Sequence, residues 1–229
     1  MPVARLVLVH GAFHGAWCWD RLTPELDRLG VRHEAVELPF TSAEGDVAAV
    51  RDVIDRIDEP VALLGHSFGG AVINAAAMKD GKPYGTTSSL VFLTAFMSEP
   101  GQVVDYSGAP GMEAIAFDED TVSIDPQAAR SVFYHRCSSD DSDWATARLR
   151  PMPSSVFIVL PVPVPSWRFL PSTYIVCTDD QILSRSAQRQ MAGNADHTFE
   201  IDSDHSPFLS CSEELARVLH RITSDEEPG

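Results

Sequence analysis

The hexapeptide GHSFGG at residues 65–70 constrains the fold of this chain more than any other segment. An apolar run at residues 61–64 precedes it, and a helix-like run at residues 71–78 follows it. The pattern G-x-S-x-G between a strand and a helix is the signature of a sharp turn that exposes a serine at the end of a strand. We expect a Cβ atom at Gly65 or Gly69 to collide with the neighbouring strand or helix. The helix beginning at this serine would point its N–H groups toward developing negative charge.

The remaining sequence alternates between strand-like and helix-like segments. A continuous apolar run, typical of a strand buried on both faces, occupies residues 6–9, and further strand-like segments occupy residues 34–38, 61–64, 90–96, 172–177 and 198–201. Helical spacing of apolar residues occurs at 17–29, 44–57, 182–191 and 212–222. The connections between these segments are short. The alternation therefore predicts an α/β fold with a mostly parallel sheet of about six strands and helices on both faces.

The alternation stops between residues 98 and 170. This segment is rich in proline and carries only two short helix-like stretches, at 125–137 and 142–149. An insertion after a sheet strand, on the edge where ligands bind, is typical of a cap over a pocket. We therefore predict a core made of residues 1–97 and 171–229, with a small cap insertion at 98–170.

The composition excludes several classes of partner. A net charge of −16 argues against binding to nucleic acid or to an anionic membrane surface. No apolar run approaches the ~20 residues that span a bilayer, and no secretory signal opens the chain. The four cysteines show no pairing or metal-ligand spacing. We expect a cytoplasmic protein without a metal or another cofactor, and the oligomeric state, including a homodimer, stays open.

A serine becomes nucleophilic when a base takes its proton, and the base needs a third group to fix its tautomer. Ser67 is the candidate nucleophile, and His205, just after the last strand, is the candidate base. The acid is Asp179 or Asp180, because neighbouring side chains at the end of a strand alternate and only one can face the histidine. Asp202 and Asp204 precede the histidine closely, and we expect them to shape its loop.

An oxyanion hole needs two backbone N–H groups about 3 Å from the developing charge. Phe68 directly follows the candidate nucleophile, and Ala12 lies in the loop after the first strand. We expect these two amides to form the hole and His10 and His66 to brace loops. The residues predicted to line a substrate pocket, each with core packing or loop support as the alternative, are Phe13, His14, Phe133, Trp144 and Trp167.

Several segments, in order along the chain, resemble one branch of the α/β-hydrolase superfamily. They are HGAFHGAW at 10–17, GHSFGG at 65–70, FLTAFM at 92–97, FYHRC at 133–137, YIVCTDD at 174–180 and DH at 204–205. That branch contains the plant methylesterases, including salicylate methylesterases, and the hydroxynitrile lyases. The resemblance implies an α/β-hydrolase fold with the site residues proposed above. It also favours Asp180 as the acid, because the branch's pattern Cys-Thr-Glu-Asp ends on that residue.

Two departures from the lyases bear on the reaction. The lyases carry threonine where this chain has Gly11, and lysine directly after the catalytic histidine, where this chain has Ser206. The resemblance therefore implies a serine hydrolase that cleaves a small-molecule carboxylic ester through an acyl-enzyme intermediate. Cyanohydrin cleavage and slow-turnover ligand binding, as in hydrolase-fold receptors, remain alternatives. The acidic composition and compact N-terminus favour a bacterial relative.

Overall fold

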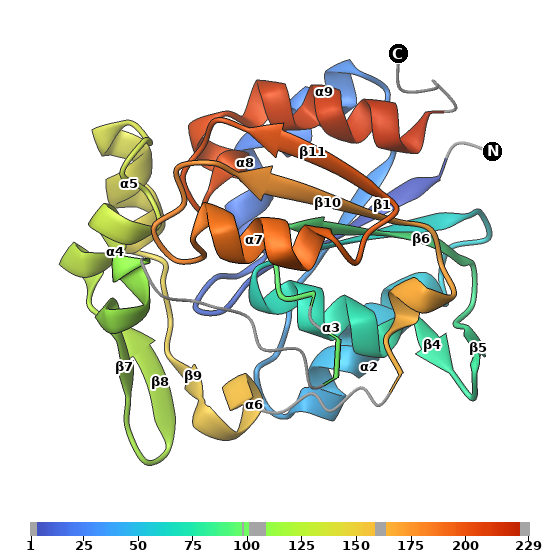
Figure 1. Ribbon diagram of the computed structural model, residues 1–229, viewed down its shortest axis with the longest axis horizontal. Coiled ribbons are helices and arrows are strands. Elements are labelled where there is room, and N and C mark those ends of the chain that lie inside the picture. The colour runs from blue at the N-terminus through green and yellow to red at the C-terminus, as the bar shows by residue number, and fades with distance from the viewer. Residues whose placement is uncertain (1–3, 98, 101–108, 159–163, 225–229) are drawn as a thin grey trace.

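The computed structural model describes residues 4–97, 99–100, 109–158 and 164–224. A central six-stranded sheet with the strand order β11-β10-β6-β3-β1-β2 organises them (Figure 1), and every neighbouring pair is parallel. The strands are β1 (Arg5–Val9), β2 (His33–Val36), β3 (Val61–His66), β6 (Thr87–Leu93), β10 (Ser172–Cys177) and β11 (His197–Ile201). The predicted parallel sheet of about six strands is confirmed.

Helices cover both faces of this sheet (Figure 1). On one face lie α2 (Ala43–Ile54), α3 (Phe68–Ala76) and α7 (Arg185–Ala192); on the other, α1 (Thr23–Arg28) packs with α9 (Ser212–Thr223). Strands covered from both sides must be apolar throughout, which explains the continuous apolar runs in the sequence.

A short hairpin, β4 (Met78–Lys79) with β5 (Lys82–Pro83), follows α3, and α8 (Pro207–Ser210) precedes α9. No helix in the described ranges is long and apolar enough to cross a membrane.

The single helix predicted over residues 17–29 is wrong. The segment forms a 3-10 helix, η1 (Ala16–Arg21), and then the separate helix α1. Pro24 stands in the first turn of α1. Proline has no N–H to donate and fits only the first turn of an α-helix, so a helix can begin at this residue but cannot run through it.

The described part of the 98–170 insertion forms a small unit at one end of the sheet (Figure 1). It contains the predicted pair of helices, as α4 (Pro126–Val132) and α5 (Ser139–Thr146). It also contains an antiparallel sheet of β7 (Ile115–Phe117), β8 (Thr121–Ile124) and β9 (Met152–Pro153), which the sequence did not indicate because strands of two to four residues show too little alternation. The helices η2 (Pro110–Ala114), α6 (Ser154–Ile158) and η3 (Ser166–Arg168) complete it.

The turn between β3 and α3 depends on two glycines, as predicted. A Cβ atom at Gly65 would lie 2.5 Å from the carbonyl oxygen of Gly69. A Cβ atom at Gly69 would lie 2.5 Å from the carbonyl oxygen of Val9 and 2.6 Å from that of His10. Backbone atoms on both sides leave no room for a side chain, so α3 begins in direct contact with the end of β1.

Replacing Gly69 with alanine is therefore expected to lower the free energy of unfolding by about 1–3 kcal/mol, the usual cost of overpacking. Urea unfolding followed by circular dichroism measures this change. Gly193→Ala is the matched control, because its φ of −62° suits alanine and its closest contact would be 3.3 Å, to Gln190. Equal changes in the two variants would contradict the steric explanation.

Candidate active site

Ser67 stands at the tip of the β3–α3 turn with φ 51° and ψ −119°. Non-glycine residues seldom adopt a positive φ, and such strain concentrates at functional sites. The surrounding backbone holds this conformation. The Ser67 N–H donates to the carbonyl of Leu93 (3.2 Å), and the Ser67 carbonyl accepts from the N–H groups of Gly70 (3.0 Å) and Phe96 (3.3 Å).

His205 lies in the loop after β11 and is 1% exposed. Its Nδ1 is 2.6 Å from Oδ2 of Asp180. A carboxylate can only accept, so Nδ1 carries the ring proton and Nε2 keeps a lone pair. The ring of Phe133 stacks on the imidazole, with centroids 5.5 Å apart. This histidine is therefore buried, oriented and in the tautomer that a general base requires.

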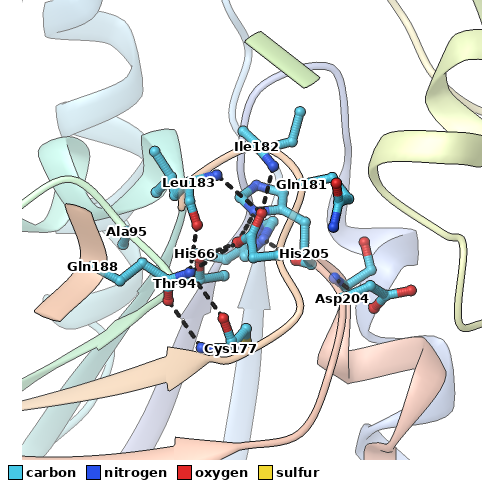
Figure 2. Close-up of polar contacts among 12 residues, drawn as sticks. His66, Thr94, Ala95, Cys177, Gln181, Ile182, Leu183, Gln188, Asp204 and His205 are labelled. Carbon is cyan, nitrogen blue, oxygen red and sulfur yellow. Dashed lines mark hydrogen bonds and ion pairs between the residues drawn. The ribbon is translucent and has the colours of Figure 1, made fainter. Parts of the chain in front are cut away.

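Asp180 is held by donors on both carboxylate oxygens, and Figure 2 labels the residues that supply them: Thr94, Ile182, Leu183, Gln188 and His205. Oδ1 accepts from the backbone N–H groups of Ile182 (2.6 Å) and Leu183 (2.9 Å). Besides His205, Oδ2 accepts from Thr94 Oγ1 (2.5 Å) and Gln188 Nε2 (3.4 Å). Sequence reasoning gave Thr94 and Gln188 no role. The role of Thr94 could have been predicted, because Thr94 follows β6, and β6 is the neighbour in the sheet of β10, the strand before Asp180.

Asp179 points away from this cluster. Its Oδ2 lies 3.2 Å from His135 Nε2 and 3.4 Å from Arg136 Nη1, and its side chain is 46% exposed. Both partners belong to the insertion. The structure thus brings Asp180, and not Asp179, to His205, which is the arrangement that the family resemblance favours.

The two aspartates before His205 connect its loop to the insertion. Asp202 forms two hydrogen bonds with the guanidinium of Arg136 (2.7 and 2.9 Å), which lower the pKa of that carboxyl. Asp204 is fully buried and accepts from the N–H groups of Arg136 (2.9 Å) and Ser206 (3.0 Å) and from Ser210 Oγ (2.8 Å). As expected, these carboxylates shape the histidine's loop.

The loop after β1 lies against the Ser67 turn. A Cβ atom at Gly11 would be 3.0 Å from Ser67 Cβ and 2.8 Å from His66 Nδ1. Across the described residues, no protein acceptor binds the N–H of Ala12 or of Phe68. Toward the part of the chain that the structure describes, the two amides predicted for the oxyanion hole are thus uncommitted, and they belong to two chain segments that meet at the serine.

His10 and His66 brace loops, as predicted. His10 Nδ1 donates to the Gly11 carbonyl (2.9 Å) and its Nε2 accepts from the Leu38 N–H (3.0 Å). His66 Nε2 donates to the carbonyl of His205 (2.9 Å; Figure 2 shows the two histidines together). Burial lowers the pKa of His10 to about 3 and that of His66 well below its usual value, so both rings stay neutral.

Four phenylalanines form a connected row of rings that ends on His205. Centroids lie 6.3 Å apart for Phe13 and Phe133, 6.3 Å for Phe13 and Phe157, and 6.2 Å for Phe68 and Phe157. The structure therefore places Phe133 against the candidate base and Phe13 one ring further along this row. Phe157 was missed, because nothing in its proline-rich surroundings indicates which way it faces.

The other residues predicted to line a pocket have different surroundings. His14 is buried, and both of its ring nitrogens are hydrogen-bonded to protein groups, so neither is left for a substrate. Trp144 packs edge-on against Trp17 (5.2 Å), and Trp167 packs against Phe92 (5.6 Å). Within the described ranges neither tryptophan has a ring contact with His205, so their pocket role stays a prediction. The same ranges contain no group of three or more side chains that could hold a metal.

A strained serine at the carboxyl end of a central parallel strand, with an oriented Asp–His pair in the loops that follow β10 and β11 at the same edge of the sheet, is the arrangement expected of an α/β-hydrolase. A family model described as the alpha/beta hydrolase family matches residues 6–218. The chain belongs to this family.

Individual relatives match over almost the whole chain. Methylesterase 2 of Arabidopsis thaliana is 30% identical, with 91% of each chain covered. The structure of the methylesterase MES16 from Arabidopsis superposes with a TM-score of 0.81 at 27% identity, covering 96% of this chain and 98% of that one. A pyrethroid hydrolase from Sphingobium faniae JZ-2 gives a TM-score of 0.82 at 25% identity, covering 96% and 97%. The two methylesterases agree with the branch that the sequence resembles.

Proposed function

We propose that this protein is a serine hydrolase that cleaves small carboxylic esters through an acyl-enzyme intermediate. The observation that carries the proposal is the 2.6 Å hydrogen bond from His205 to Asp180, at the same edge of the parallel sheet as a serine held at φ 51°. The names of the relatives, two of them methylesterases and one a pyrethroid hydrolase, support ester hydrolysis as the reaction.

In this proposal, His205 Nε2 takes the Ser67 proton as the hydroxyl attacks the ester carbonyl. Asp180 holds the ring and stabilises the imidazolium that forms. The Ala12 and Phe68 amides bind the oxyanion. His205 then protonates the leaving alcohol and activates the water that releases the acid. The 98–170 insertion serves as the cap, and Phe13 and Phe133 contact the substrate.

Cyanohydrin cleavage is the second candidate, and two observations disfavour it. The space beside Gly11 is filled by the side chains of His66 and Ser67, so the threonine of the lyases does not fit without a shift. Ser206 is fully buried, and in the described structure its Oγ has no hydrogen-bond partner. A lysine there would have to bury its ammonium group at considerable cost.

The test is a comparison of substrates on the purified protein. We expect saturable release of p-nitrophenol from p-nitrophenyl acetate, with kcat of about 1 s⁻¹ or more, and no cyanide from mandelonitrile. A set of methyl, aryl and lactone substrates would then define the preferred ester. Cyanide release without ester hydrolysis would establish the lyase instead. Tight binding of esters with a kcat orders of magnitude lower would favour a receptor.

A further inference from the structure

The loop that carries Ala12 is strained, and the carbonyls of residues 11–14 are all hydrogen-bonded. Phe13, directly after Ala12, has φ 66°, a value unusual for a residue with a side chain. Such a conformation persists only where surrounding contacts fix it. The Gly11 carbonyl is bound by His10 within the same loop. The carbonyls of Ala12, Phe13 and His14 are bound by groups that lead to the insertion.

The first of these connections runs through His14. Its Nδ1 lies 2.7 Å from the Ala12 carbonyl oxygen, and its Nε2 lies 2.7 Å from the hydroxyl of Tyr134. Burial lowers the pKa of His14 to about 4, so the ring is neutral at neutral pH. A carbonyl only accepts, hence Nδ1 carries the proton, Nε2 accepts, and the Tyr134 hydroxyl donates. The direction of every hydrogen bond in this chain of contacts is therefore fixed.

The second connection comes from Arg150, which follows α5 in the insertion. Its backbone N–H donates to the Phe13 carbonyl (2.9 Å), and its Nε donates to the His14 carbonyl (3.2 Å). Its Nη2 donates to the carbonyl of Leu38 (2.7 Å) and to Glu37 Oε1 (2.5 Å). The guanidinium thus joins the loop after β1 to the segment after β2.

We propose that Tyr134 and Arg150 are positioning residues that hold the Ala12 N–H in the orientation needed by the oxyanion hole. This inference rests on the proposed function. Neither side chain has to touch the substrate. They act by preventing the strained backbone at Phe13 from relaxing. Such a relaxation would rotate the preceding peptide groups and turn the Ala12 N–H away from Ser67. The insertion would then be part of the catalytic apparatus as well as its cover.

The test compares Tyr134→Phe, which removes one hydroxyl, with Tyr84→Phe. Tyr84 is the matched control, because its hydroxyl bonds to Asp55, which ends α2 outside the insertion and outside the loop after β1. For Tyr134→Phe we expect kcat to fall about tenfold, less than the loss from removing an oxyanion donor outright, with KM unchanged within about twofold. The rate of Ser67 labelling by a fluorophosphonate should fall by the same factor. Arg150→Lys should behave similarly, and Arg148→Lys should behave like wild type.

A merely structural role would give a different result. It would lower the fraction of active protein, measured by fluorophosphonate titration, and leave kcat per active site unchanged. An unchanged kcat per active site in Tyr134→Phe, or an equal fall of kcat in Tyr84→Phe, would overturn the inference. Ester hydrolysis by the wild type would still support the proposed function. If no ester is hydrolysed, the ¹⁵N–¹H correlation spectrum decides: the Ala12 and Phe13 signals should move in Tyr134→Phe and not in Tyr84→Phe. Unmoved signals would overturn the inference independently of activity.

Discussion

Ser67→Ala is expected to lower kcat for ester hydrolysis by about 10⁶, to the level left by binding and the oxyanion hole alone. The substitution removes only the hydroxyl that we propose attacks the carbonyl. The turn itself is held by backbone hydrogen bonds to Leu93, Gly70 and Phe96, which alanine leaves in place. Steady-state hydrolysis of p-nitrophenyl acetate, together with loss of fluorophosphonate labelling, measures the effect.

Two further variants make this result specific. Ser88→Ala should leave the activity unchanged, because its hydroxyl bonds to the Val61 carbonyl at the opposite end of the sheet strands. Ser67→Gly should be as inactive as Ser67→Ala but more stable, by about 1 kcal/mol, since glycine adopts φ 51° and ψ −119° without strain. Activity within tenfold of wild type in Ser67→Ala would identify another nucleophile.

The parts of this molecule that sequence reasoning predicted are those determined locally. A continuous apolar run implies a strand covered on both faces, whatever lies elsewhere in the chain. The close approach of α3 to β1 at Gly69 is built into one short motif. The position of His205 follows from its place directly after the last strand. These features need no knowledge of distant partners.

The acid shows where local reasoning ends. Alternation at the end of β10 implies that one of two neighbouring aspartates faces the histidine but does not say which. The choice depends on partners far away in the sequence. Thr94 forms a hydrogen bond with Asp180, and His135 and Arg136 form hydrogen bonds with Asp179. Only the family resemblance distinguished them beforehand. The orientation of the aromatic side chains in the proline-rich insertion is even harder to predict, because no periodicity of the sequence indicates which way they face.

Asp180→Asn is expected to lower kcat by about 10⁴, and Asp179→Asn by less than about threefold. In the first variant the N–H groups of Ile182 and Leu183 still require an acceptor where Oδ1 now stands. The amide oxygen of asparagine must take that place, so its NH₂ group turns toward His205 Nδ1. A donor there forces the ring proton onto Nε2, and the histidine can no longer accept the Ser67 proton.

Asp179→Asn removes only a partly exposed ion pair with Arg136 and leaves a neutral group beside His135, and such exposed pairs contribute little. The two variants change the same charge at adjacent positions, so each controls for the other. Circular dichroism and urea unfolding establish that both are folded before kcat is compared. The opposite outcome, full activity in Asp180→Asn and a large loss in Asp179→Asn, would mean that the 2.6 Å contact between Asp180 and His205 is structural. The base would then be oriented by a carboxylate that now faces the insertion, which would require the insertion to move during catalysis.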